Sequence, residues 1–145
     1  NCGSRVHGKV HEIDLEQAMY SFKVNVNGAF IAAQEASKRM ISLKKGAIFF
    51  TGATASIKGF PESSTFAMGK FAIRGLAQSL YRELSPQGIH VAHFVIDGAV
   101  SKVSEIDDFG KLTANAIAKS YMWVLKQPRQ AWTHEIELRG CTEKF

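Results

Sequence analysis

The fold of this chain is decided by the stretch Ala47-Ile48-Phe49-Phe50-Thr51-Gly52-Ala53-Thr54-Ala55-Ser56. Its first four residues are an uninterrupted apolar run, the pattern of a short strand buried on both faces of a parallel sheet. The residues that follow are small or carry a hydroxyl, which is typical of a tight turn after such a strand. A second run of this kind, residues 89–96, ends at Asp97-Gly98. The two runs predict two central strands of one parallel sheet.

Long amphipathic segments surround these two runs. The first predicted helix begins at Asp14, which can cap its free N–H groups, and continues with a bend to about Met40. Its apolar residues recur at three- and four-residue spacing and predict one buried face: Phe22, Val26, Phe30 and Ala33. The other predicted elements are a helix over 63–84, a helix over 113–127 and a strand over 132–138. This alternation predicts an α/β fold, a Rossmann-like doubly wound parallel sheet with its sites at the carboxyl ends of the strands.

Composition is that of an ordinary globular domain, with 145 residues, 46% of them hydrophobic and 21% charged. The formal net charge is +5. The basic residues are nevertheless scattered singly or in pairs, so we expect no nucleic-acid partner. No apolar run approaches the roughly 20 residues needed to cross a bilayer, so we expect no membrane partner either. A small-molecule substrate is the expected partner.

Cysteine and histidine spacing argues against a metal centre. Cys2 and Cys141 lie at opposite ends of the chain without a C-x-x-C pattern, so neither a metal site nor a disulfide framework is expected. His90 and His93 are three residues apart in a predicted strand and therefore face opposite sides of it. We expect no metal site and a reducing, cytoplasmic location.

Four motifs follow one another in a specific order. They are Asn1-Cys2-Gly3, then Asn25-Val26-Asn27-Gly28, then the loop after residue 50, then Phe66-Ala67-Met68-Gly69-Lys70. In this order and spacing the chain resembles the short-chain dehydrogenase/reductase family over nearly all of its length. The resemblance implies that residues 1–145 are the carboxyl-terminal part of a single Rossmann-type oxidoreductase domain. The first strands and the glycine-rich phosphate turn of that family precede the position of Asn1.

The resemblance also implies a cofactor, NAD or NADP, and a set of residues around it. Asn25 falls where the family has its active-site Asn, which anchors a water relay. Lys70 falls where the family has the Lys whose ammonium holds the nicotinamide ribose and lowers the pKa of a catalytic Tyr. The residues expected to contact the cofactor are Asn1, Gly3, Thr51, Gly52, Lys70, Asp97, Gly98 and Val100.

Two departures from the family motif affect the chemistry. Phe66 stands in the place of the catalytic Tyr and Ala53 in the place of the catalytic Ser, and neither side chain can exchange a proton. General acid–base catalysis typically contributes ~10²–10⁴-fold, so its loss raises a barrier by roughly 3–5 kcal/mol unless another group replaces it. The neighbouring hydroxyls are Thr54, Ser56, Ser64 and Thr65, each of which also suits a turn or a helix cap. The catalytic candidates are Asn25, Lys70 and Thr54.

The sequence therefore predicts an NAD(P)-dependent oxidoreductase that acts on a small carbonyl or alcohol substrate. Two other interpretations stay open: a catalytically silent relative that serves as a binding or dimerisation module, and an enoyl-type reductase. The helix over 63–84 is apolar on more than one face, including Phe71, Ile73, Leu76 and Leu80. A helix of this kind needs partners on two sides, so we expect a homo-oligomer built on the two long helices.

Overall fold

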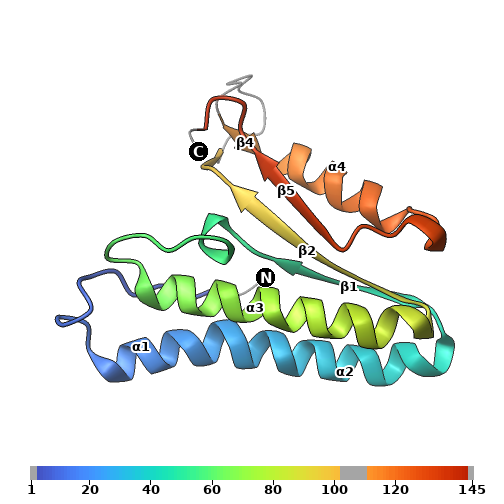
Figure 1. Ribbon diagram of the computed structural model, residues 1–145, viewed down its shortest axis with the longest axis horizontal. Helices are drawn as coiled ribbons and strands as arrows, with labels where there is room; N and C mark the ends of the chain where they lie inside the picture. Colours follow the sequence, from blue (N-terminus) through green and yellow to red (C-terminus); the bar gives the residue numbers. More distant parts are fainter. Residues whose placement is uncertain (1–2, 102–110, 144–145) are drawn as a thin grey trace.

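The computed structural model describes residues 3–101 and 111–143 and shows a parallel sheet covered by helices on both faces (Figure 1). The strand order is β1-β2-β5, with β1 at Gly46–Thr51, β2 at Ile89–Asp97 and β5 at Glu135–Arg139. One face carries α1 (Leu15–Phe22), α2 (Gly28–Leu43) and α3 (Ser64–Leu84), and the other carries α4 (Ala114–Leu125). The predicted α/β fold with a doubly wound parallel sheet is confirmed.

Strand β2 is the centre of the sheet. It pairs in parallel with β1 from Gly46↔Ile89 to Thr51↔Phe94, and with β5 from His93↔Glu135 to Asp97↔Arg139. With a strand on each edge and helices on each face, β2 is buried at all but one of its nine residues. This burial on both faces explains why residues 89–96 form a continuous apolar run. The carboxyl ends of β1 and β2 therefore lie together at one end of the sheet.

Alternation along β2 divides the core into two halves. Val91 packs toward α3 with Ile73 and Ala77, whereas Phe94 packs toward α4 with Val124. His90 and His93 also lie on opposite faces of the sheet, as predicted. His90 stacks on Trp132 with ring centroids 4.6 Å apart, and His93 bonds Glu135 on the other face.

The first predicted helix is three helical segments in line. Asp14 caps α1, because its carboxylate accepts the backbone N–H of Gln17 at 2.9 Å. The predicted bend is a π-helical segment at Lys23–Asn27, which separates α1 from α2. The wider turn shifts the residues beyond it around the helix axis. The predicted burial of Phe30 is wrong, since its side chain is 50% exposed, whereas Ala33 is buried as expected. Phe22 and Val26 are half-buried, because the buried positions of this helical run are Ser21, Asn25 and Ala33.

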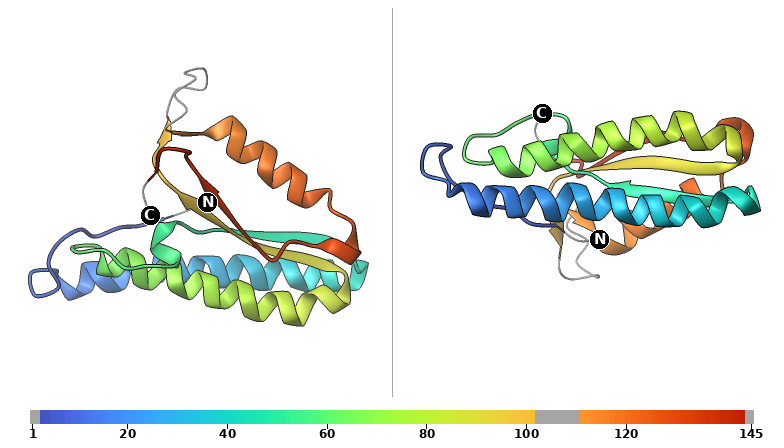
Figure 2. Two further views of the ribbon diagram at one scale, coloured as in Figure 1. Left: turned by 45° about the horizontal axis from the view of Figure 1, so that its top comes forward. Right: turned by 90° about the horizontal axis from the view of Figure 1, so that it is seen from below.

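Helices α1 and α2 run alongside α3 beneath the sheet. The right-hand view of Figure 2 shows these helices from below. Two short strands, β3 (Val100–Ser101) and β4 (Leu112–Thr113), pair with each other outside the main sheet. None of the helices in the described ranges is long and apolar enough to cross a membrane.

Candidate active site

Lys70 places a buried ammonium group at the carboxyl end of β1. The residue belongs to α3 and is only 8% exposed, and its Nζ donates a hydrogen bond to the carbonyl oxygen of Thr51 at 2.9 Å. This bond uses one of the three ammonium protons. Burial lowers the pKa of Lys70. The carboxyl end of β1 thus holds a cation whose remaining protons can bind a ligand.

A cavity of about 410 Å³ brings three of the predicted residues together. It lies between α2 and β1 and is lined by Asn25, Thr51 and Lys70. Small residues of α2 and the upstream half of β1 form the rest of its wall. Residues 25, 51 and 70 are far apart in the sequence, and the fold gathers them in the wall of this cavity, which runs along the edge of β1 that no described strand pairs with. Thr54 is not among the residues that line it.

Asn25 connects the amino-terminal segment to this cavity. It lies in the π-helical segment and is almost fully buried, and its Oδ1 accepts the N–H of Ser4 at 3.1 Å while its Nδ2 donates to the carbonyl of Ser4 at 2.7 Å. Gly69 makes room for it, because an added Cβ there would lie 3.0 Å from the Asn25 Cβ. Gly3 lies beside the same amide, whereas Asn1 is outside the described residues.

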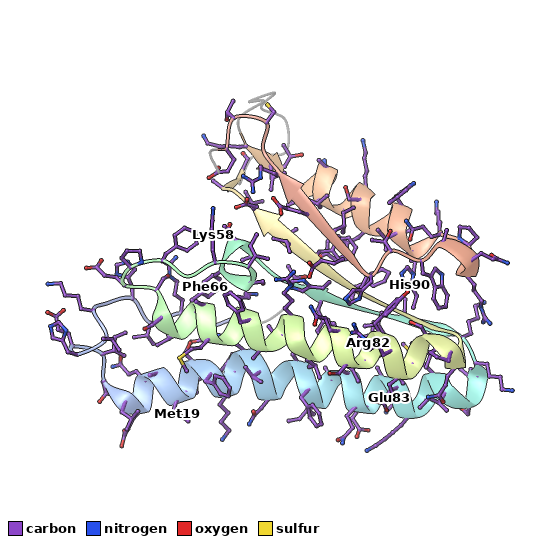
Figure 3. All side chains as sticks on the ribbon, viewed as in Figure 1. Met19, Lys58, Phe66, Arg82, Glu83 and His90 are labelled. Carbon is purple, nitrogen blue, oxygen red and sulfur yellow. The ribbon has the colours of Figure 1, made fainter. Side chains whose placement is uncertain are left out.

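Phe66 and Lys70 lie one turn apart on α3. The Nζ of Lys70 is 5.6 Å from the centroid of the Phe66 ring, and the guanidinium carbon of Arg5 is 5.5 Å from the same centroid. The half-buried ring therefore has two cations around it. Figure 3 shows Phe66 near the start of α3, at the opposite end of the helix from Arg82 (Figure 3).

The comparison with known families decides the relationship, because the short chain dehydrogenase model matches residues 1–105. The chain belongs to the short-chain dehydrogenase family. L-2,3-butanediol dehydrogenase of Corynebacterium glutamicum is 39% identical over 93 residues, which are 63% of this chain and 34% of that protein. The inactive 2-(S)-hydroxypropyl-CoM dehydrogenase 2 of Xanthobacter autotrophicus is 33% identical over 101 residues, which are 70% of this chain and 44% of that protein.

The solved structure of a short-chain dehydrogenase from Rhodopseudomonas palustris shares the fold. Its TM-score is 0.81 at 34% identity, over 96% of this chain and 59% of that chain. The chain therefore spans less than two thirds of the length of each of these three proteins. Against this family, the distinctive feature of the chain is that its Tyr-x-x-x-Lys motif begins with Phe66.

In this member of the short-chain dehydrogenase family a carboxylate approaches the loop after β1. Asp97 ends β2 and is 2% exposed, and it accepts a hydrogen bond from the hydroxyl of Thr54. Arg139, its register partner on β5, forms an ion pair with the same carboxylate at 2.5 Å. The Thr54 hydroxyl is thus oriented with its proton toward Asp97, while the oxygen lone pairs point elsewhere.

Two of the other candidate hydroxyls, those of Ser56 and Thr65, bind the backbone. Ser56 is fully buried and accepts the N–H of Ala53 at 3.1 Å. Thr65 accepts the N–H of Val6 and donates to its carbonyl, which fixes the amino-terminal segment on α3. Among the candidates Thr54, Ser56 and Thr65, Thr54 is the one bonded to a carboxylate.

The glycines of the two strand ends have local structural causes. Gly52 is buried, its N–H bonds the carbonyl of Phe94 at 2.7 Å, and a Cβ there would collide with Nε2 of His93. Gly98 has φ +133°, a conformation that favours glycine. Val100 is 46% exposed in β3. The cofactor contacts expected of Gly52, Gly98 and Val100 stay predictions.

Two polar contacts could not be found from local sequence signals. The hydroxyl of Thr51 bonds the phenol of Tyr121 at 2.7 Å, and the Tyr121 ring stacks on Phe94 with centroids 3.6 Å apart. Burial raises the pKa of Tyr121, against the opposing effect of the Thr51 hydroxyl. This phenol comes from α4, on the face of the sheet opposite to α3.

The second unforeseen contact is a half-buried ion cluster between α3 and the sheet. Arg74 donates two hydrogen bonds to Glu135, at 2.8 and 2.7 Å, and Glu135 bonds Nδ1 of His93 at 2.9 Å. Burial lowers the pKa of His93. Burial by itself raises the pKa of Glu135. The hydrogen bonds that Arg74 and His93 donate to its carboxylate outweigh this effect, so the pKa of Glu135 is lowered. Within the described ranges, no group of three or more His, Cys, Asp or Glu residues could hold a metal ion.

Proposed function

We propose that this short-chain dehydrogenase is an NAD- or NADP-dependent oxidoreductase that acts on a small carbonyl or alcohol substrate. The observation that carries the proposal is the position of Lys70, whose buried ammonium lines the cavity at the carboxyl end of β1 together with Asn25. Both residues occupy the positions that the family motif reserves for its active site. The relative named for butanediol dehydrogenation supports a small substrate.

The residues present fit a nicotinamide cofactor. Lys70 keeps ammonium protons for a ribose hydroxyl, and Thr51 and Asn25 line the same cavity. When bound, the nicotinamide supplies or accepts a hydride at the substrate carbon. We propose that the phosphate-binding turn belongs to the part of the domain that the relatives have and residues 1–145 do not.

Thr54 takes the proton role that Phe66 cannot fill. In alcohol oxidation the Thr54 oxygen accepts the proton of the substrate hydroxyl, while the proton of Thr54 passes to the carboxylate of Asp97. Reduction of a carbonyl runs this transfer in reverse. Arg139 keeps Asp97 in place through the ion pair, so the carboxylate is a positioning and proton-accepting group that the substrate does not touch.

A catalytically silent relative is the second candidate. Phe66 and Ala53 favour it, because both positions have lost the groups that exchange protons in the family motif. The relative from Xanthobacter autotrophicus is itself named inactive. Such a protein would bind the cofactor through Lys70 and turn over neither carbonyl nor enoyl compounds.

The domain and its assembly belong to the same proposal. Residues 1–145 form the carboxyl-terminal part of one Rossmann-type domain, because β1 is paired on one edge only among the described strands and the cavity runs along its other edge. The exposed apolar residues Phe30, Ile31, Met68 and Phe71 on α2 and α3 support a homo-oligomer through these helices. Light scattering that finds only monomers would exclude it. The absence of a cysteine motif supports a cytoplasmic location.

Fluorescence titration of the protein with reduced cofactor, followed by turnover of small aldehydes, ketones and enoyl compounds, tests the proposal. We expect quenching, carbonyl reduction, and loss of both in Lys70→Met. Thr54→Val should lower kcat by about 10²-fold or more, whereas Thr54→Ser should keep most of it. Cofactor binding without any turnover would establish the silent relative. Absence of binding would reject the oxidoreductase.

A further inference from the structure

The ring of Phe66 lies within reach of two cations that come from different parts of the chain. Arg5 belongs to the segment before α1, and Lys70 follows Phe66 by one turn of α3. Their charged groups lie 5.5 and 5.6 Å from the ring centroid. One aromatic ring is therefore within cation–π range of two positive charges.

Neither cation is neutralised by a carboxylate within residues 3–101 and 111–143. Arg5 donates to the hydroxyl of Ser63 at 3.0 Å and Lys70 donates to a backbone carbonyl, and both acceptors are uncharged. Glu62 and Asp97 have other partners. Glu62 faces His7 at 3.7 Å, and Asp97 pairs with Arg139. The surroundings of Phe66 thus keep an excess of positive charge.

The substitution of the motif Tyr by Phe66 increases this excess. A phenol beside an ammonium can ionise and supply the compensating negative charge, whereas a phenyl ring cannot. An anionic group that binds here would supply the balancing charge instead. Arg5 keeps most of its N–H donors after the bond to Ser63, and its planar fork matches a carboxylate.

We propose that the substrate of this protein carries a carboxylate, which Arg5 binds beside the Phe66 ring and the charge of Lys70 attracts. The inference rests on the proposed oxidoreductase function and adds the charge class of its substrate. A carboxylate is favoured over a neutral polar group because both cations at this ring lack an acidic partner. Arg5 is the residue that would distinguish a keto acid from the matching keto amide.

Calorimetric titration with butanoate and butanamide tests the inference, because the two ligands have nearly the same shape and differ in charge. We expect the protein, saturated with reduced cofactor, to bind butanoate at least tenfold more tightly than butanamide. Arg5→Met should reduce this ratio to near one, and Arg5→Lys should keep part of it. Arg82→Met removes one positive charge from the far end of the same helix and should leave the ratio unchanged (Figure 3).

Equal affinity for the two ligands, or failure to bind either, would overturn the inference. So would an unchanged ratio in Arg5→Met, or an equal loss in Arg82→Met, which would indicate net charge alone. Thermal melts confirm that each variant is folded, and Arg5→Lys keeps the test valid if Arg5→Met unfolds. The butanoate and butanamide titrations are repeated without cofactor. A protein that prefers butanoate but does not bind cofactor would reject the proposed oxidoreductase function and leave the inference about the carboxylate standing.

Discussion

Restoring the phenol of the family motif should raise the catalytic rate. In Phe66→Tyr the added hydroxyl extends from a ring whose centroid is 5.6 Å from the Nζ of Lys70. At an effective dielectric constant of about 20, two unit charges at that distance interact by about 3 kcal/mol, which eases ionisation of the phenol by roughly a hundredfold. Arg5 adds less, because it is exposed and screened. An unpaired buried hydroxyl would offset this by about 1–3 kcal/mol.

We therefore expect Phe66→Tyr to increase kcat for carbonyl reduction by at least tenfold, and Phe66→Tyr with Ala53→Ser to increase it further. Steady-state assays at saturating cofactor measure the effect. Phe71→Tyr is the matched control, since it adds the same hydroxyl to an exposed ring of α3. If both Phe66 variants fold, bind cofactor and show no gain over the unmodified protein, the site does not use the Tyr-Lys mechanism.

Three further predictions concern stability. Gly52→Ala should lower the free energy of unfolding by about 1–3 kcal/mol in urea titrations, because the new methyl group meets His93 and lies 2.6 Å from Oγ of Ser56; no loss would show that the site relaxes freely. Leu84→Ala should cost about 2–5 kcal/mol in the same assay, since Leu84 is fully buried, and a cost under 1 kcal/mol would contradict its place in the core. Burial lowers the pKa of His93 in the folded state, so the unfolded chain binds more protons and stability should fall as the pH drops below about 6.5. Melting temperatures from pH 8 to 5 should show a smaller fall in His93→Gln, and an equal fall would assign the effect to other groups.

The sequence was sufficient for the elements whose patterns are local. The apolar runs at 47–50 and 89–96 identified β1 and β2, and the Asp14 cap identified the start of α1, because burial on two faces and capping leave a signal within a few residues. Phe30 was misplaced because the buried face was chosen by apolar character, whereas the buried positions of this helical run include the polar residues Ser21 and Asn25.

The residues of the site likewise fall into two groups: those that motif spacing identifies and those that only the folded structure shows. Asn25 and Lys70 could be selected from motif spacing, and the fold gathers them at one cavity with Thr51. The pairing of Asp97 with Arg139 could not be selected, since it follows from the register of two strands about forty residues apart. Contacts of this kind depend on tertiary pairing and leave no periodic or local pattern.

Hydride transfer itself is the most direct test of the account. The protein is incubated with reduced cofactor that carries deuterium at the transferable C4 position of the nicotinamide, together with 3-oxobutanoate as the carbonyl compound, and the product alcohol is analysed by mass spectrometry. The account predicts one deuterium at the carbinol carbon, and none when Lys70→Met replaces the unmodified protein. Product without deuterium, or no product although the cofactor binds, would contradict the claim that this chain contributes the active site of an oxidoreductase.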